Sequence, residues 1–340
     1  MIEEHGELRE SAREVVAGFG PRADEGKVWE RLVELGWLLV AVPEELGGLG
    51  QGRAGAGVLY GELGRGVIGA TYLPAMLVLD AICQSELADR QAWIERIAGG
   101  EFVSAALAAS DVSGGHSKLN GIAHAVFSAD KASHVLVCAA DCVALAPVGC
   151  SGMELVRRPT WDETRVLFDV RFTDVALSAD LIFASGAAAN RISDNLAAHR
   201  DLALAADSVG GAAALLDMVV EYLCTRRQFG RPLALFQALK HRCADLKAQI
   251  SAAEALLNRA LARGEGAEAE AALTAKMAKQ LACAVYATMA EEAVQLHGGI
   301  AMTSEHNCHL YLKRALLNQR LGAGGDNEAR RVGAALLGAA

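Results

Sequence analysis

The sequence predicts an α+β fold in which a small β domain lies between two helical parts. Up to about residue 100, apolar residues recur every three or four positions, as on the buried face of a helix. Between about residues 103 and 183, short runs rich in β-branched residues replace that period. The helical period then returns in longer segments. We therefore expect three domains, at residues 1–102, 103–185 and 186–340.

The first domain is expected to be helical and to contain one tight connection. Leu8 and Ala12 share a face of one helix, and Trp29 and Val33 recur at the same spacing in a second helix. Residues 42–50 read VPEELGGLG. Proline fixes φ and closely spaced glycines allow positive φ, so this segment is predicted to be a turn.

The middle domain is predicted to be an antiparallel β domain, because short runs alternate with glycine-rich clusters. Those clusters, at residues 113–115 and 120–121, are expected to be turns. The expected strands lie at residues 123–127, 134–137, 143–145 and 165–172.

The third domain is predicted to be an antiparallel bundle of long helices joined by short loops. Leu235, Leu239, Leu246 and Ile250 recur at three or four residues, the spacing of one buried face. Residues 263–272 are rich in Gly, Ala and Glu, and we expect a turn between helices there.

Composition excludes several classes of protein. With 340 residues and 52% hydrophobic content the chain can bury sizeable cores. A net charge of −9 argues against nucleic-acid binding, which depends on clustered Lys and Arg. The eight cysteines occur singly and without metal-ligand spacing, so we expect reduced thiols and no metal site. The charged N-terminus and the lack of a long uninterrupted apolar run predict a cytoplasmic protein without a membrane span.

Two motifs in the last third of the chain carry a specific resemblance. Residues 226–237 read RRQFGRPLALFQ, similar to the RxQFGxPLxxFQ stretch of acyl-CoA dehydrogenases. Residues 295–301 read QLHGGIA, followed by Glu305, and resemble the QxxGGxG segment of that family. The LGW at residues 35–37, with the turn at residues 42–48, resembles the family's N-terminal signature. The resemblance covers essentially the whole chain and implies a C-terminal four-helix bundle.

The resemblance implies that these motifs contact the adenosine and pyrophosphate of an FAD held mainly by a neighbouring subunit. Chemically, a guanidinium suits phosphate, glycines let backbone N–H groups approach an anion, and glutamine side chains can bond ribose or phosphate oxygens. The residues assigned to this role are Arg226, Gln228, Phe229, Phe236, Gln237, Gln295, Gly298 and Gly299.

Each of these residues has a simpler interpretation when it is taken alone. Arg226 could be an exposed charge at a helix end, and Gly298 with Gly299 could be an ordinary helix stop. Phe229 and Phe236 alone are more typical of a core. Their joint occurrence, in order and at the family's spacing, favours the cofactor interpretation.

The catalytic base of the family has no counterpart here, and we assign no catalytic residue. The family's reaction needs a carboxylate that removes the α-proton of an acyl thioester. At the usual base position the nearest match is Ala323, and at the alternative position early in the bundle it is Arg200. Asp201 is one residue along, where a helix turns a side chain by about 100° and should direct it elsewhere. Glu328 lies more than a helical turn beyond the family position.

The chain's own flavin cradle is also degraded. Where the family has a TEPxAGSD-like loop, residues 108–115 read AASDVSGG. Ala125 and Phe127 stand at the Trp and Thr of a WIT-like strand. Both are poor substitutes for flavin stacking and hydrogen bonding.

The resemblance therefore implies an accessory subunit whose partner supplies the catalytic Glu and the flavin cradle. The pattern is similar to the α2β2 acyl-CoA dehydrogenases of actinobacterial sterol side-chain degradation, which implies a sterol-derived acyl-CoA substrate. The expected electron acceptor is an electron-transfer flavoprotein. Two alternatives remain: a homotetrameric dehydrogenase that uses Asp201 or Glu328 as base, and a non-enzymatic scaffold on the same fold.

Overall fold

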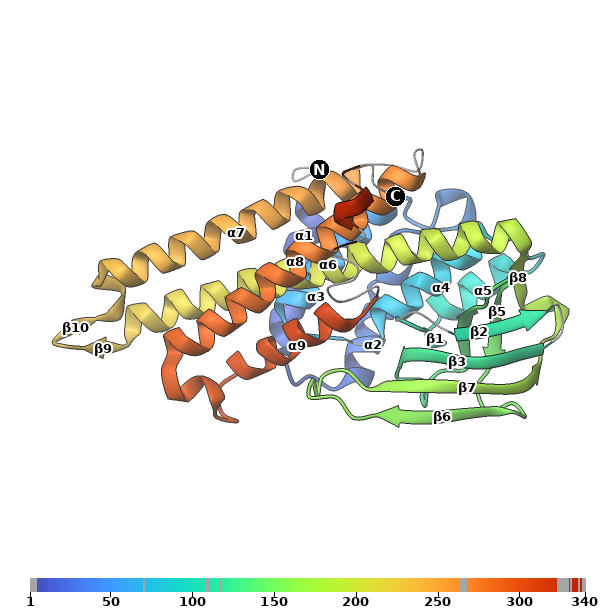
Figure 1. The fold of residues 1–340 in the computed structure, drawn as a ribbon, viewed down its shortest axis with the longest axis horizontal. Coiled ribbons are helices and arrows are strands. Elements are labelled where there is room, and N and C mark those ends of the chain that lie inside the picture. The colour runs from blue at the N-terminus through green and yellow to red at the C-terminus, as the bar shows by residue number, and fades with distance from the viewer. Residues whose placement is uncertain are drawn as a thin grey trace.

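The computed structural model describes residues 5–69, 71–107, 111–115, 118–262, 268–322, 330, 332–335 and 337. Figure 1 shows helices, then strands, then long helices along the chain, so the predicted α+β fold is confirmed. The division at residues 1–102, 103–185 and 186–340 stays a prediction.

The N-terminal part is helical, as predicted. Its turn at residues 42–50 contains a short 3-10 helix at Glu44–Leu46, and Gly47 has a φ of 80°. A Cβ on Gly48 would lie 2.0 Å from the carbonyl oxygen of Val42, so only glycine fits there. The helices are α1 (Gly6–Phe19), α2 (Glu25–Glu34), α3 (Gly52–Arg65), α4 (Tyr72–Gln84) and α5 (Arg90–Ala98).

The middle part forms two four-stranded sheets, ordered β1-β4-β5-β8 and β2-β3-β7-β6. Neighbouring strands are antiparallel except for β1 and β4, which pair in parallel. The strands are β1 (Val103–Ala105), β2 (Asp111–Gly115), β3 (Lys118–Phe127), β4 (His134–Cys138), β5 (Cys142–Pro147), β6 (Met153–Arg158), β7 (Leu167–Ala176) and β8 (Ile182–Ser185).

Two turn predictions in this part are wrong. Residues 113–115 lie in β2, and Asn120 and Gly121 lie inside β3. Gly121 has a φ of 121°, and a Cβ there would lie 2.0 Å from the carbonyl oxygen of Asp111. The glycine therefore allows a β-bulge and close strand pairing, not a reversal of the chain.

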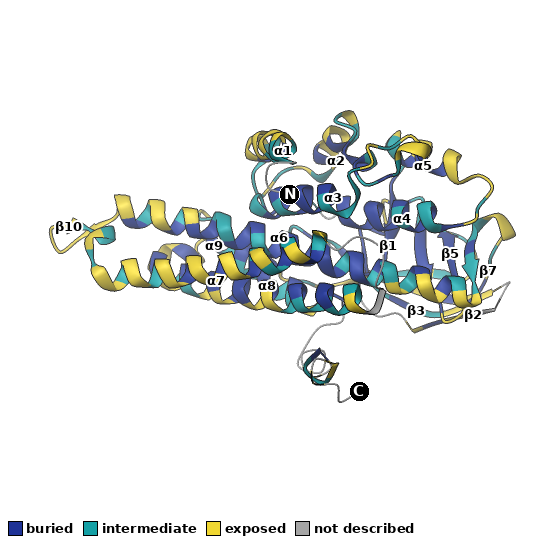
Figure 2. Cartoon of the chain, turned by 90° about the horizontal axis from the view of Figure 1, so that it is seen from above, coloured by how far each residue is buried: buried dark blue, intermediate teal, exposed yellow. Residues whose placement is uncertain are grey.

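The C-terminal part is a bundle of four long helices: α6 (Gly186–Thr225), α7 (Gln237–Ala262), α8 (Glu268–His297) and α9 (Cys308–Arg320). Leu246 and Ile250 of α7 are buried, as predicted, and Figure 2 shows the exposed residues of α7 facing outward. Leu235 is 53% exposed, because it precedes α7 in a 3-10 helix. Of the expected turn at residues 263–272, residues 263–267 lie outside the described residues, and α8 already begins at Glu268.

Helix α6 joins the sheets to the opposite end of the molecule. It follows β8 directly and ends at a small hairpin, β9 (Arg227–Gln228) and β10 (Arg231–Pro232), and Figure 1 shows sheets and hairpin at opposite ends. Its 40 residues span about 60 Å. Among the described helices, α6 is long and apolar enough to cross a membrane, but 67% of its most apolar window is buried in the fold, as in a core helix.

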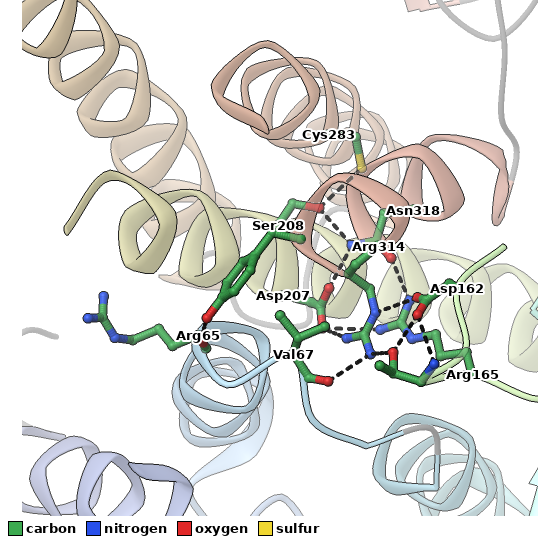
Figure 3. A network of polar contacts seen from close by, with 11 residues as sticks. Arg65, Val67, Asp162, Arg165, Asp207, Ser208, Cys283, Arg314 and Asn318 are labelled. Atoms are coloured by element: carbon green, nitrogen blue, oxygen red, sulfur yellow. Dashed lines mark hydrogen bonds and ion pairs between the residues drawn. The ribbon is translucent and has the colours of Figure 1, made fainter. Parts of the chain in front are cut away.

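A buried polar network ties α6 and α9 to the β domain (Figure 3). Arg314 of α9 is fully buried, and its Nε donates to Asp162 at 2.9 Å while its Nη1 donates to Asp207 of α6 at 3.0 Å. Arg165 donates to the same Asp207 oxygen at 3.1 Å, and Asn318 donates to the other oxygen at 2.6 Å. Two buried cations thus face two buried carboxylates, and this pairing offsets the cost of removing the four charges from water.

The two arginines of this network have opposite pKa shifts. Burial lowers the pKa of Arg165 to about 10, helped by the positive charge of Arg314. Burial also acts to lower the pKa of Arg314, but Asp162 and Asp207 raise it above its ordinary value. Both side chains therefore stay charged at neutral pH.

Replacing Arg314 by leucine should destabilise the fold severely. The substitution leaves Asp162 buried without the cation that it bonds, and breaking a buried pair in this way costs about 3–5 kcal/mol. Arg320→Leu is the matched control, because it removes an exposed arginine from the same helix and should change the unfolding free energy by less than about 0.5 kcal/mol. Urea unfolding measures both, and equal values for the two variants would contradict the role of the network.

Candidate functional site

The hairpin after α6 turns at Phe229 and Gly230. Their φ angles are 52° and 78°, and two successive positive φ values are typical of the type I′ turn of two-residue hairpins. Gly230 adopts this conformation freely, whereas Phe229 adopts it at a cost. Arg227 braces the turn by donating to the carbonyl oxygen of Gly230 at 3.2 Å.

The turn presents an aromatic side chain to solvent. Phe229 is 88% exposed, more than any other large hydrophobic side chain in the described part of the protein. Phe236 lies behind it with ring centroids 6.2 Å apart, and the guanidinium of Arg231 lies 3.9 Å from the Phe236 ring centroid. Phe229 is therefore not a core residue of this chain, while Phe236 is half-buried and supports the turn.

Arg226 has a fixed backbone and a free side chain. Its backbone N–H donates to the carbonyl oxygen of Tyr222 at 2.8 Å, and its carbonyl oxygen accepts from the backbone N–H of Leu233 at 2.9 Å. No side chain among the described residues engages its exposed guanidinium. Gln228 and Gln237 are also exposed, so one guanidinium and two amides face solvent around the hairpin.

The second motif lies at the same end of the bundle. Helix α8 ends at His297, whose ring lies 4.8 Å from that of Tyr222 in the last turn of α6. Gly298 follows with a φ of 69°, and a Cβ on Gly298 or Gly299 would meet no atom within 4 Å. Gln295 is exposed one turn earlier. The structure thus brings both motifs to the hairpin end of the bundle.

Sequence reasoning missed the supporting role of His297. The side chain is buried, and its Nδ1 lies 2.8 Å from the carbonyl oxygen of Ala293, while its other face meets His306 with ring centroids 4.6 Å apart. Burial is the main cause that lowers its pKa, so it is neutral at pH 7. Its position directly before Gly298 was visible in the sequence, but its packing on Tyr222 of another helix was not.

The hairpin end fits an anionic nucleotide-like group. Arg226, Arg227 and Arg231 are exposed there, and the backbone of Gly298 and Gly299, without Cβ obstruction, lies at the same end of the bundle. Guanidinium groups and accessible N–H groups are the usual ligands of phosphate. The hairpin lies at the end of the bundle opposite the sheets (Figure 1).

The alternative base position holds an ion pair. Arg200 donates to one oxygen of Asp201 from Nε and Nη2, at 3.1 and 3.0 Å. The long arginine folds back onto its neighbour. Asp201 is 1% exposed, and a Cβ on Gly322 would lie 2.8 Å from its carboxylate. A buried, paired carboxylate is poorly placed to take a substrate proton. The other positions considered for the base, Ala323 and Glu328, lie outside the described residues.

The positions at which the family cradles a flavin are occupied in this chain by residues of the core. Phe127 is completely buried, and the guanidinium of Arg165 lies 5.3 Å from its ring centroid. Ala125 is 5% exposed and has a φ of 54°. Residues 108–110 of the expected loop lie outside the described residues, and residues 111–115 form β2.

Two protein-family models match the chain: the acyl-CoA dehydrogenase N-terminal domain at residues 2–101 and the C-terminal domain at residues 190–336. The acyl-CoA dehydrogenase IpdE2 of Mycobacterium tuberculosis is 34% identical over 326 residues, which covers 92% of this chain and 91% of that protein. The chain belongs to the acyl-CoA dehydrogenase family. IpdE2 of Mycolicibacterium smegmatis is 30% identical to this family member over 319 residues. The aligned region covers 93% of this chain and 88% of that protein.

Solved structures of acyl-CoA dehydrogenases have the same fold. The Tcur3481-Tcur3483 steroid ACAD, determined as a variant, aligns with a TM-score of 0.85 and 25% identity over 99% of this chain and 98% of that one. The ChsE4-ChsE5 complex from Mycobacterium tuberculosis aligns with a TM-score of 0.84 and 23% identity over 98% and 96%. Members of the acyl-CoA dehydrogenase family are FAD-dependent oxidoreductases.

Gly298 and Gly299 should respond differently to alanine. Gly298 needs a left-handed conformation that costs an L-residue about 1–2 kcal/mol, so Gly298→Ala should lower the unfolding free energy by about that amount. Gly299 has no positive φ and open space around it, so Gly299→Ala should leave stability unchanged or slightly higher. Thermal or urea unfolding of both variants measures the difference, and a Gly298→Ala variant as stable as the parent would contradict this geometry.

Proposed function

We propose that this chain is the subunit without a catalytic base in a heteromeric FAD-dependent acyl-CoA dehydrogenase, where it completes the FAD site of its partner. One observation supports the contact with a neighbouring subunit: the eight residues expected to contact FAD gather at the hairpin end of the bundle, and α6 runs about 60 Å from there to the chain's own sheets. A cofactor that they touch must therefore be held by another chain. That this neighbour is a different subunit rests on the altered base and flavin positions described below.

In such a complex FAD accepts the hydride that leaves the β-carbon of the acyl thioester. The residues of this chain act on the far side of the cofactor. Arg226 would neutralise pyrophosphate, the exposed amides of Gln228 and Gln295 would bond polar oxygens, and the bare backbone at Gly298 would approach an anion closely. Phe229 would enter an apolar pocket of the partner, which supplies the carboxylate base.

Two observations at the chain's own site support a division of labour between subunits. Asp201, the described candidate for a relocated base, is buried and paired with Arg200. Phe127 fills the core where a flavin-side hydroxyl is expected. Within the described residues, which do not include Glu328, a homo-oligomer of this chain would have neither a free base nor that hydroxyl. A scaffold would not require an exposed, strained Phe229 beside a free guanidinium.

The substrate class and the electron acceptor follow from resemblance. One structural relative, Tcur3481-Tcur3483, is a steroid ACAD whose name joins two components. Another is the ChsE4-ChsE5 complex. We propose by analogy a sterol side-chain acyl-CoA as substrate and an electron-transfer flavoprotein as acceptor, in the cytoplasm.

Flavin content of the chain alone and of a co-expressed complex tests the proposal. We expect colourless or insoluble protein from the lone chain, and a yellow complex with about half a flavin per chain when a neighbouring dehydrogenase subunit is co-expressed. Absorbance near 450 nm and the mass from size-exclusion chromatography measure both. Stoichiometric FAD and acyl-CoA oxidation by the lone chain would overturn the proposal in favour of a relocated base, and a complex without flavin would favour a scaffold.

Within that complex, Phe229→Ala should weaken FAD retention without destabilising the subunit. The side chain is 88% exposed, so its loss should change unfolding by less than about 0.5 kcal/mol. At an interface, however, a buried aromatic anchor commonly contributes about 2 kcal/mol, more than a tenfold change in dissociation constant. Trp161→Ala is the control, since Trp161 is 82% exposed in the loop between β6 and β7. Equal FAD affinity in both variants would refute the role of Phe229.

A further inference from the structure

A concave site lies away from the hairpin, between α1, α3, α6 and α7. Its volume is about 230 Å³, far larger than the roughly 10–15 Å³ that one water molecule needs. None of the eight residues at the hairpin end lines it. Its function must be inferred from its own lining.

The floor of this cavity is bare backbone. A Cβ on Gly210 of α6 would lie 1.9 Å from the carbonyl oxygen of Gly61 in α3, so the two helices touch at these glycines. A Cβ on Gly61 itself would meet only the carbonyl oxygen of Ala206, at 3.7 Å, so the space above Gly61 is open. Aliphatic side chains surround it: Val58, Val209, Leu257 and Leu261.

Helix α1 presents a basic face to the cavity. Arg9 and Arg13 are spaced four residues apart, which places them on one side of the helix, and both line the cavity together with His5, which precedes the helix. Arg13 is fully engaged, because it donates to both oxygens of Glu62, at 2.8 and 3.1 Å. Among the described residues, Arg9 is only loosely paired, since the one carboxylate that it meets there, that of Glu254, lies at 3.9 Å.

Helix α7 adds a cation from the other wall. Lys247 lines the cavity and makes no ion pair within the part of the chain that the structure describes. The lining thus holds four permanent cations against two carboxylates, but Arg65 also bonds Asp217, outside the lining, at 2.8 Å. The described groups therefore leave an excess of one positive charge in a protein of net charge −9. These groups are Arg9, Arg13, Arg65 and Lys247 against Glu62 and Glu254.

We propose that this cavity binds a small amphipathic anion, a carboxylate on a short apolar body. The carboxylate would lie between Arg9 and Lys247, the two lining cations that the described carboxylates compensate least. The apolar body would lie over Gly61 against the aliphatic walls. A bare phosphate matches the cations but leaves that apolar surface unmatched.

Isothermal titration of the full chain, co-purified with its partner if the lone chain is insoluble, tests the site with sodium octanoate and with sodium phosphate as probes. We expect octanoate to bind and Lys247→Gln to weaken it about tenfold, as for the loss of one charge-assisted hydrogen bond. Gly61→Leu should abolish binding by filling the open space. Lys27→Gln, which removes an exposed lysine of α2, should leave binding unchanged.

The titration can fail or succeed independently of the proposed FAD site, because it measures neither flavin turnover nor acyl-CoA binding. The proposal is overturned if octanoate does not bind, if phosphate binds and octanoate does not, or if Lys247→Gln binds octanoate as tightly as the parent. If Gly61→Leu fails to fold, Lys247→Gln still decides, because it changes only an exposed side chain.

Discussion

A single helix sets the geometry on which the function depends. Helix α6 leaves the sheets at Gly186 and delivers the chain to the hairpin after Thr225, about 60 Å away. A straight helix cannot fold back, so the exposed Phe229 and Arg226 stay remote from the chain's own β domain. Under the proposed function, the chain offers one half of a cofactor site at the hairpin end. At the other end, Phe127 fills the core at the Thr position of the family's WIT-like strand.

The rigidity of that arrangement comes from buried polar groups along α6. Asp207 accepts hydrogen bonds from Arg314, Arg165 and Asn318, which belong to α9 and to the β domain (Figure 3). Closer to the sheets, His199 bonds Asp80 of α4 at 2.7 Å and Tyr60 of α3 at 2.9 Å. These contacts fix the direction of α6 against both neighbouring domains, and hence the direction in which the hairpin projects.

Much of this could be predicted from the sequence, and what could not has physical causes. The helical period predicted the bundle, which the structure confirms, because local spacing carries that information. The two motifs predicted a set of residues that the structure brings to the hairpin end, and their contact with FAD stays a prediction. The turn predicted at Asn120 and Gly121 was wrong, since a glycine in a strand permits a bulge as readily as a turn. The ion pair of Arg200 with Asp201 was missed because helical geometry directs Cβ atoms but not the end of a long side chain. The packing of His297 on Tyr222 joins residues 75 positions apart, which no local pattern encodes.

Photo-crosslinking from the tip of the hairpin tests the central claim most directly. A benzophenone amino acid in place of Phe229, in the flavin-loaded complex, reports which chain surrounds that position when the irradiated sample is digested and analysed by mass spectrometry. If this subunit completes a site on its partner, the cross-links connect residue 229 to the partner chain. Cross-links confined to this chain, or to a second copy of it, would contradict the account.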